Sequence, residues 1–249
     1  MIRLIRLGQA SQHPTLIAIP GIDGSIGSLE SMVRRLAQNR AVIAVDYSAE
    51  TNPTLEGLSA EIAAALQAEN LTSFDLLGQS IGTIVAAQIA SDYSLPVRRL
   101  VLVCTFTRLV TPMLQMTVLA LKLTPKWLAR LMSPLSVALL CGPVGDGRNN
   151  PAFAGARNAD QAGVAKRTGW EIERDFALDL AKMKLSQPLL VLMGEKDRFV
   201  PNAKREVAKL RALFADRPAQ VETIPQAGHI FLPTAAIKLA VEKISAFLE

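Results

Sequence analysis

Short apolar runs alternate with amphipathic segments along the first part of the chain. The runs expected to form strands are almost continuously apolar and cover residues 16–19, 41–45, 74–77 and 100–104. The segments between them repeat apolar residues at helical spacing and cover residues 28–38, 54–69 and 81–91. Strands that are apolar on both faces are typical of a parallel sheet covered by helices on each side. The pattern therefore predicts an α/β fold, with a mostly parallel central sheet and helices on both faces.

The pattern changes between residues 105 and 186, where strand signals are scarce. Residues 111–140 are rich in Leu and Met at helical spacing, and residues 168–185 are expected to form a further helix. Residues 141–165 contain five glycines and are expected to form a loop. The middle of the chain is thus predicted to be helical and irregular rather than part of the sheet.

The alternation of strands and helices resumes after residue 187. Strands are expected at residues 188–193 and 219–224, and helices at residues 202–214 and 234–248. These late strands need the earlier sheet as a pairing partner. We therefore expect one α/β core from residues 1–104 and 187–249, with residues 105–186 as a helical insertion.

Composition places the chain among globular proteins, because 50% of its 249 residues are hydrophobic and 20% are charged. Two cysteines, Cys104 and Cys141, are too few for a disulfide framework, which favours a reducing compartment. The uncharged stretches at 109–121 and 131–145 are shorter than the ~18 apolar residues of a membrane-spanning helix. The N-terminal residues lack the apolar core of a secretory signal. We expect a cytoplasmic protein with no transmembrane segment.

The net charge of +5 comes entirely from the middle of the chain. Residues 105–186 hold 11 Lys and Arg against 6 Asp and Glu, and the remainder holds 16 of each sign. Such an excess forms either a solvated helical face or a surface that attracts an acidic partner. Nucleic acid is not expected as a partner, because the sequence has no basic run, no interleaved aromatic residues and no recognisable reader motif.

The strongest chemical signal is the sequence Gly78-Gln79-Ser80-Ile81-Gly82, which lies between a predicted strand and a predicted helix. A nucleophilic serine on such a sharp turn needs glycines two residues to either side, so that side chains do not collide. The following helix N-terminus points free N–H groups at the site where an oxyanion would develop. The alternative is a serine that only caps the helix. We predict that Ser80 is a nucleophile.

A serine hydroxyl needs a base, and the sequence contains two histidines. His13 precedes the first clear strand and is expected at the amino edge of the sheet, on the surface. His229 follows the last strand, at the carboxyl edge where parallel sheets carry their sites. We predict that His229 is the base.

The base in turn needs a carboxylate that orients it. Asp197 follows the strand at residues 188–193 and is our candidate. Glu195 lies closer to the strand end among residues typical of a solvated turn, and Asp46 ends the strand at residues 41–45. Both are alternatives to Asp197.

The order Ser80, Asp197, His229, each after a strand, resembles the α/β-hydrolase fold family over residues 16–248. The resemblance implies an oxyanion hole made by two backbone N–H groups, those of Ile22 and Ile81. Many members have His-Gly where this chain has Pro20-Gly21. Pro-Gly at this position occurs in thioesterase-like and some esterase-like members.

The resemblance implies a serine hydrolase that cleaves a carboxylic ester or thioester through an acyl-enzyme intermediate. Apolar residues in the inserted segment favour an apolar acyl group, and they are Leu114, Val118, Leu121, Trp127, Leu128, Leu131, Met132 and Leu135. The resemblance places residues 105–186 in the position of the family's cap or lid, and most of these side chains are expected to pack the cap onto the core. The alternatives are an acyltransferase that uses the same intermediate, or a binding protein that has lost catalysis.

The remaining expectations concern partners and cofactors. The basic residues Lys122, Lys126 and Arg130 suggest docking of an acidic carrier protein or a coenzyme A thioester, and an anionic membrane surface is a further alternative. We expect no cofactor and no metal site, because no cluster of ligand residues has metal-binding spacing. Cys104 is expected to be a small buried residue rather than a nucleophile. Residues 142–148 are rich in glycine but lack the Gly-Lys-Ser/Thr of a phosphate loop, and are expected to form a mobile cap loop.

Overall fold

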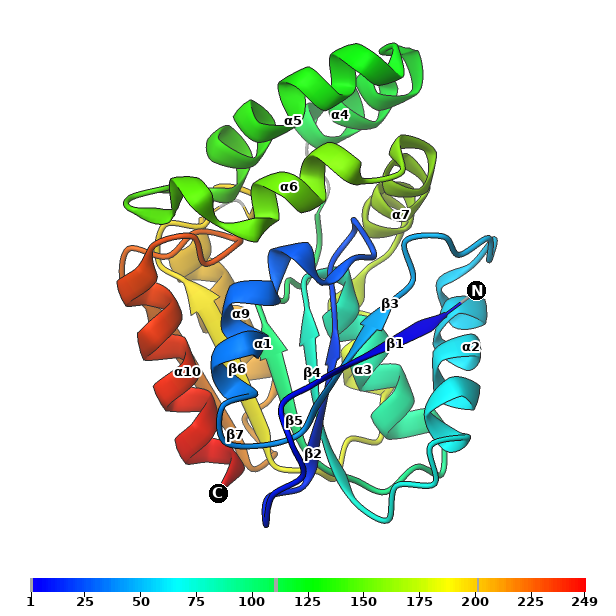
Figure 1. Cartoon of the computed structure of the whole chain (residues 1–249), viewed down its shortest axis with the longest axis vertical. Coiled ribbons are helices and arrows are strands. Elements are labelled where there is room, and N and C mark those ends of the chain that lie inside the picture. Colours follow the sequence, from blue (N-terminus) through cyan, green and yellow to red (C-terminus); the bar gives the residue numbers. More distant parts are fainter. Residues whose placement is uncertain (1, 110–111, 201) are drawn as a thin grey trace.

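The structure is a computed structural model that describes residues 2–109, 112–200 and 202–249, without the side chains of residues 112, 113, 117 and 140. Its seven-stranded sheet has the order β1-β3-β2-β4-β5-β6-β7 (Figure 1). The strands are β1 Arg3–Leu7, β2 Thr15–Ile19, β3 Val42–Asp46, β4 Phe74–Gln79, β5 Val97–Val103, β6 Leu189–Gly194 and β7 Ala219–Ile224. All neighbouring strands are parallel except β1, which pairs antiparallel with β3. The predicted fold class is confirmed.

Alternate residues of each central strand enter two separate apolar cores. In β2, Ile17 and Ile19 face one core while Leu16 and Ala18 face the other, and β5 and β6 repeat this alternation. Helices α2 Leu55–Gln67, α3 Ile81–Asp92, α8 Phe176–Lys182 and α9 Ala203–Leu213 pack on the first face. Helices α1 Glu30–Leu36 and α10 Thr234–Leu248 cover the other face. Both faces are buried, which explains why the strands are apolar throughout.

The inserted segment places four helices over the carboxyl ends of the strands (Figure 1). These cap helices are α4 Pro112–Leu123, α5 Lys126–Cys141, α6 Pro151–Asn158 and α7 Gln161–Glu173. Helix α6 packs on α5 and on the short helix η1 Ile26–Ser28, and α7 packs on α4. Residues from the middle of the chain therefore cover the carboxyl edge of the sheet. The division into core and cap domains stays a prediction.

The prediction of a loop at residues 141–165 is wrong, because the segment contains η2 Gly147–Asn149, α6 and the start of α7. Local capping starts both α-helices. The Asn150 side chain accepts a hydrogen bond of 3.0 Å from the Ala152 N–H, with Pro151 at the first helical position. Asp160 likewise accepts a hydrogen bond of 2.8 Å from the Gly163 N–H. The glycine count obscured these two start signals.

Two long predicted helices are each divided in the structure. The first, at residues 111–140, forms α4 and α5 with a break at Thr124 and Pro125, and its predicted first residue lies outside the described residues. The second, at residues 168–185, forms the end of α7 and α8, because Asp175 caps a new helix by accepting a hydrogen bond from the Leu178 N–H. Strand β1 was not predicted, because its partly exposed edge position gives no continuous apolar run.

The six strands and the helices α2, α3, α9 and α10 that the alternation predicted are confirmed to within a few residues, and the segment at 28–38 forms η1 and α1. Across the described helices, none is both long and apolar enough to cross a membrane.

Candidate active site

Ser80 lies on a strained turn between β4 and α3. Its backbone angles are φ 54° and ψ −127°, a conformation that costs an ordinary side chain roughly 1–3 kcal/mol. The glycines on either side permit the turn: a Cβ on Gly78 would lie 2.3 Å from the Gly82 carbonyl oxygen, and one on Gly82 would lie 2.2 Å from that of Pro20. The Ser80 N–H donates to the Val103 carbonyl at 3.0 Å, and the Ser80 carbonyl accepts from Thr83. The sheet and helix thus hold the strain in place.

The structure brings Ser80, His229 and Asp197 into one hydrogen-bonded chain. His229 Nε2 lies 2.9 Å from Ser80 Oγ, and His229 Nδ1 lies 2.8 Å from Asp197 Oδ2. A carboxylate only accepts hydrogen bonds, so Nδ1 carries the proton and Nε2 is free to accept one from the serine. The loop after β7 is fixed by the His229 N–H, which donates to the Cys141 carbonyl at the end of α5.

The carboxylate of Asp197 is held in place by backbone groups as well as by His229. Its other oxygen accepts hydrogen bonds from the N–H groups of Phe199 at 2.8 Å and Val200 at 3.0 Å, and its side chain is fully buried. The Phe199 ring stacks on the imidazole with centroids 4.6 Å apart. The alternatives considered from the sequence are engaged elsewhere: Asp46 pairs with Arg3, and Glu195 lies near Lys196. The three residues can therefore act as a relay, with Asp197 as the orienting carboxylate.

The loop after β2 passes directly beside the serine. A Cβ added to Gly21 would lie 3.3 Å from the Ser80 Cβ. The Tyr47 hydroxyl lies 2.6 Å from both the Pro20 and the Gly21 carbonyl oxygens, so it donates to this pair. Because a trans peptide points its C=O and N–H in opposite directions, fixing the Gly21 carbonyl also fixes the direction of the Ile22 N–H. The role of the Ile22 and Ile81 N–H groups as an oxyanion hole stays a prediction.

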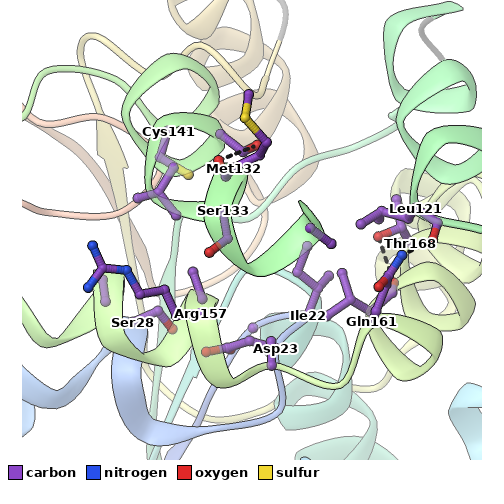
Figure 2. Close-up of a pocket in the computed structure, with 18 of the residues that line it drawn as sticks. Ile22, Asp23, Ser28, Leu121, Met132, Ser133, Cys141, Arg157, Gln161 and Thr168 are labelled. Atoms are coloured by element: carbon purple, nitrogen blue, oxygen red, sulfur yellow. Dashed lines mark hydrogen bonds between the residues drawn. The ribbon is translucent and has the colours of Figure 1, made fainter. Parts of the chain in front are cut away.

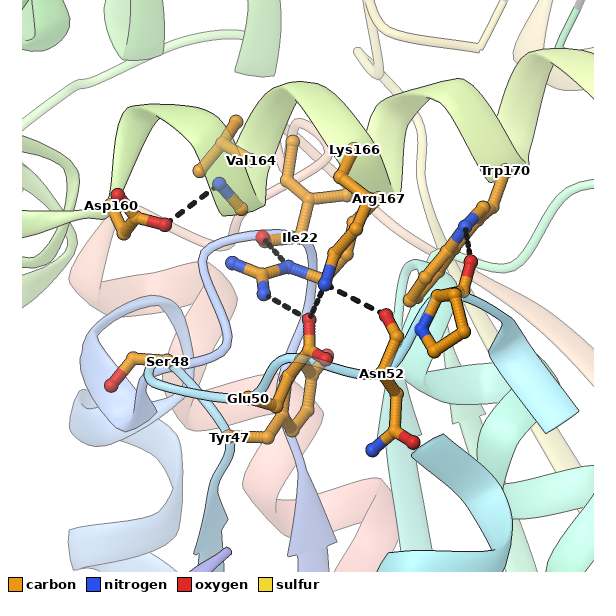
Figure 3. Close-up of polar contacts among 12 residues, drawn as sticks. Ile22, Tyr47, Ser48, Glu50, Asn52, Asp160, Val164, Lys166, Arg167 and Trp170 are labelled. Carbon is orange, nitrogen blue, oxygen red and sulfur yellow. Dashed lines mark hydrogen bonds and ion pairs between the residues drawn. The ribbon is translucent and has the colours of Figure 1, made fainter. Parts of the chain in front are cut away.

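A buried arginine of the cap holds the same loop (Figure 3). Arg167 on α7 is fully buried; its Nε donates to the Ile22 carbonyl at 2.6 Å and its Nη1 to Glu50 Oε1 at 2.9 Å. Its guanidinium lies 5.5 Å from the centre of the Tyr47 ring, and Lys166 also reaches Glu50, at 2.9 Å. These residues were missed in the sequence, because no local motif links positions so far apart. The loop geometry beside Ser80 therefore depends on a cap helix.

Two further carboxyl groups belong to this region: Glu171 is fully buried near Ser80, and Asp23 is half-buried and lines the cavity. Burial raises the pKa of Glu171 from 4.5 to about 8, although the nearby Ser80 hydroxyl and the Arg167 charge act in the opposite direction. Burial likewise raises the pKa of Asp23 from 3.8 to about 6, against a hydrogen bond from Ser25 and the charge of Arg167. Neither Glu171 oxygen has a hydrogen-bond partner among the described residues. Burial therefore favours the protonated, uncharged form of Glu171 near Ser80, and sequence reasoning did not single it out.

The raised pKa of Glu171 predicts a pH-dependent stability. Between its ordinary pKa of 4.5 and its folded pKa of about 8, the folded state keeps a proton that the unfolded state has lost. Stability therefore falls as pH rises through this window, by about 1.4 kcal/mol per pH unit at most. We expect urea unfolding to show this loss in the wild-type protein and a flatter profile for Glu171→Gln. Parallel profiles for the two proteins would contradict the assignment.

A cavity of about 700 Å³ lies between Ser80 and the cap helices. Figure 2 shows side chains of the cap, among them Leu121 and Met132, opposite Ile22 and Asp23 of the loop after β2. The lining includes Ser80 and His229 at one end, and apolar residues of all four cap helices: Leu114, Leu121, Leu128, Met132, Val137, Ala152 and Val164. The volume falls in the range of pockets that hold drug-sized molecules. The site can therefore enclose a mainly apolar small molecule against the serine.

The apolar residues singled out in the cap have different environments. Leu114 is 4% exposed, and Leu121 and Leu128 line the cavity. In contrast, Trp127, Leu131, Met132 and Leu135 are exposed by 69%, 68%, 43% and 49%. For these four, the expectation that they pack the cap onto the core is wrong.

Cys104 is fully buried and carries no disulfide, as the sequence led us to expect. Burial raises the pKa of its thiol well above its ordinary value of 9.0, and nearby Asp197 adds to the effect. Its Sγ lies with a side-chain oxygen of Asp197 and a ring nitrogen of His229 within 4.8 Å of one another, close enough to hold a metal ion. The ring nitrogens are already engaged by Ser80 and Asp197, and the thiol favours its protonated form, which is a poor ligand. The arrangement fits the hydrogen-bonded relay better than a metal centre.

Comparisons with known proteins identify the family and the fold. A family model described as the alpha/beta hydrolase family matches residues 16–240. A pyrrolizixenacetamide deacetylase from Xenorhabdus hominickii is 26% identical over 215 residues, which cover 77% of this chain and 76% of that protein. A bromoperoxidase from Bacillus anthracis shares the fold with a TM-score of 0.79 at 17% identity, over 99% of this chain and 95% of that one. An enol-lactonase from Burkholderia xenovorans LB400 shares it with a TM-score of 0.76 at 17% identity, over 99% and 96%.

Proposed function

The chain belongs to the alpha/beta hydrolase family, and we propose that it is a serine hydrolase that cleaves a carboxylic ester or thioester with an apolar acyl group. The observation that carries the proposal is the relay from Asp197 through His229 to Ser80, at 2.8 and 2.9 Å, ending on a strained turn beside a mainly apolar cavity. The relay supplies the nucleophile and its base, and the cavity supplies a place for the acyl group.

Acylation begins when Ser80 Oγ attacks the carbonyl carbon of the substrate while His229 Nε2 takes the hydroxyl proton. The negative charge that forms on the carbonyl oxygen is stabilised by the N–H groups of Ile22 and Ile81 and by the N-terminal end of α3. Asp197 stabilises the imidazolium through Nδ1. The bond to the alcohol or thiol then breaks, His229 returns the proton to the leaving group, and the acyl group remains on Ser80.

Deacylation repeats these steps with water. A water molecule attacks the acyl carbon and gives a proton to His229, and Ser80 recovers this proton as the carboxylic acid leaves. Glu171 affects both halves through its charge. A neutral Glu171 leaves the developing oxyanion without a nearby negative neighbour, whereas an ionised Glu171 would oppose it. The active form of the site is therefore the one with Glu171 protonated.

The lining of the cavity supports an apolar acyl group. Its lining is more apolar than polar, although Lys126, Arg130 and Arg157 also contribute to it. The relative from Xenorhabdus hominickii is named a deacetylase, so it removes an acetyl group. Each methylene that enters such a pocket contributes about 0.8 kcal/mol, or roughly fourfold in kcat/KM, until the pocket is full. The cavity is larger than an acetyl group requires.

We therefore expect p-nitrophenyl hexanoate or octanoate to be hydrolysed faster than p-nitrophenyl acetate, by at least tenfold in kcat/KM. Val164 on α7 lines the cavity, so Val164→Phe should shift the optimum to shorter chains. The matched control is Leu178→Phe, at a position 57% exposed on α8, which should leave the optimum unchanged. Acetate hydrolysed as fast as octanoate would rule out the apolar acyl pocket.

The other candidate reactions give different products. Hydrolysis of acyl thioesters without hydrolysis of esters would assign the thioester half of the proposal. Transfer of the acyl group to an added alcohol in preference to water would identify an acyltransferase. Failure of a fluorophosphonate probe to modify Ser80 covalently would indicate a binding protein, because the probe reports an activated serine without requiring the right substrate.

A further inference from the structure

We propose that the hairpin formed by α4 and α5 docks onto a lipid bilayer that carries anionic headgroups. The hairpin, residues 112–141, lies at the end of the molecule farthest from the amino edge of the sheet (Figure 1). This inference concerns where the protein binds and is independent of the chemistry at Ser80.

The first observation is the concentration of exposed apolar side chains on the hairpin. Among the described side chains, nine large hydrophobic ones are exposed, and eight of these lie on α4 and α5. They are Met116, Leu119, Leu123, Trp127, Leu131, Met132, Leu135 and Leu139, with exposures between 43% and 74%. A patch of this kind is uncommon on a soluble surface and marks an interaction site.

The second observation is the charge of the same hairpin. Residues 112–141 contain three basic residues, Lys122, Lys126 and Arg130, and no acidic residue. All three basic side chains are exposed, and in sequence they are interleaved with the exposed Leu123, Trp127 and Leu131. Apolar residues with a tryptophan and neighbouring Lys and Arg are the pattern of helices that lie in the interface of an anionic membrane.

The occupant follows from these two observations together. An acidic carrier protein would pair with the three cations but would leave eight apolar side chains to be covered by a surface of unknown shape. A second copy of the chain would cover the apolar side chains but would bring three like charges against three others, which opposes pairing. A bilayer with anionic headgroups matches both features, because the apolar side chains enter the acyl region and the cations stay at the headgroups.

The hairpin also connects the bilayer to the cavity. Leu121, Leu128 and Val137 line the cavity from the same two helices that carry the exposed residues. A docked hairpin would therefore place the cavity next to the acyl region, from which an apolar substrate could enter without crossing water. This supplies a physical reason for the exposed surface.

The test measures binding of the full chain to vesicles. Trp127 is 69% exposed, whereas the second tryptophan, Trp170, is buried and donates its Nε1–H to the Pro53 carbonyl at 3.2 Å. We expect a blue shift of tryptophan fluorescence, and co-sedimentation, with vesicles of phosphatidylcholine mixed with phosphatidylglycerol. Vesicles of phosphatidylcholine alone should bind much more weakly. Trp127→Phe should keep the sedimentation and lose the fluorescence shift.

Variants separate the two contributions to binding. Each cation near an anionic surface contributes about fivefold, so replacing Lys122, Lys126 and Arg130 by Gln should weaken binding on the order of 100-fold. Leu123→Ser with Leu131→Ser should weaken it further at high salt, where the apolar contribution dominates. The matched charge control replaces Lys182, Lys204 and Arg205, which are exposed on α8 and α9, and should bind as wild type. The matched apolar control is Leu178→Ser.

Ser80→Ala should bind vesicles as the wild type does, so the outcome is separate from that of the proposed function. Equal binding to neutral and anionic vesicles, or binding that the control variants reduce as much as the hairpin variants, would overturn the proposal. The absence of vesicle binding would also overturn it. In that case, size-exclusion chromatography with light scattering would show whether the hairpin forms a dimer. Salt-sensitive binding of an acidic carrier protein would show that the hairpin binds a protein instead.

Discussion

Replacing Ser80 by alanine is expected to lower kcat/KM for ester hydrolysis on the order of 10⁴-fold or more. The loss has a simple reason: without Oγ, His229 has no hydroxyl to deprotonate and no acyl-enzyme forms. Residual hydrolysis, from water held beside the N–H groups of Ile22 and Ile81, sets the floor. The measurement is kcat/KM of the purified proteins with a series of p-nitrophenyl esters, with active sites counted by fluorophosphonate titration.

Stability measurements show whether the loss is chemical. Ser80 has φ 54°, a conformation that alanine tolerates no better, so Ser80→Ala should unfold within a few degrees of the wild type. Ser80→Gly should be equally inactive yet more stable, by about 1 kcal/mol, because glycine adopts this conformation without strain. The exposed Ser186→Ala serves as the matched control and should retain full activity. Retention of more than a few per cent of the rate by Ser80→Ala would remove Ser80 from the mechanism.

The second large effect is expected from Arg167→Met, which should lower the free energy of unfolding by about 3 kcal/mol. Arg167 and Glu50 are both fully buried and 2.9 Å apart, so removing the arginine leaves a buried carboxylate with only Lys166 as a partner. The Ile22 carbonyl loses its donor at the same time. We therefore expect kcat to fall along with stability, because the loop beside Ser80 is no longer held.

Three variants distinguish this explanation from simple loss of packing. Arg167→Met combined with Glu50→Gln removes the unpaired charge and should regain part of the lost stability. Arg167→Lys keeps the charge but lacks the planar fork that reaches Ile22 and Glu50 together, so it should restore stability better than kcat. Arg174→Met, at the end of the same helix and 26% exposed, removes two surface ion pairs, with Glu56 and Asp179, and should cost about 1 kcal/mol. Wild-type stability of Arg167→Met would show that the ion pair is dispensable.

The sequence was informative wherever one local pattern carries both structure and chemistry. Ser80 was predictable because its turn needs two glycines at fixed spacing between a strand and a helix, and the structure has this strained turn. Asp197 and His229 were predictable because each follows a strand, and parallel strands bring their carboxyl ends to one edge. Among the predicted strands, His13 precedes the first and His229 follows the last, so the choice of His229 over His13 needed no three-dimensional information. The catalytic roles of these residues stay predictions, to be tested by the variants above.

The cap shows where this reasoning ends. Helix α6 and the start of α7 were missed, because the glycines in this segment favoured a loop over the helix starts that Asn150 and Asp160 cap. The apolar residues of the hairpin could be identified, but helical spacing does not say whether a face meets the core, a cavity or solvent. Leu121 lines the cavity while Leu119 is 57% exposed, and only the packing of α4 against α7 decides between them.

What the sequence alone determined is the α/β core and the three residues at its carboxyl edge. Apolar strand runs, helical spacing and the position of a residue after a strand can all be read from a short stretch of sequence. What only the tertiary structure decided is the environment of those residues. The proximity of Arg167 to Ile22 and Glu50 spans more than a hundred positions of the chain, and the raised pKa of Glu171 comes from burial beneath Ser80. Burial and charge neighbours are sums over the whole fold, and no single stretch of sequence contains them.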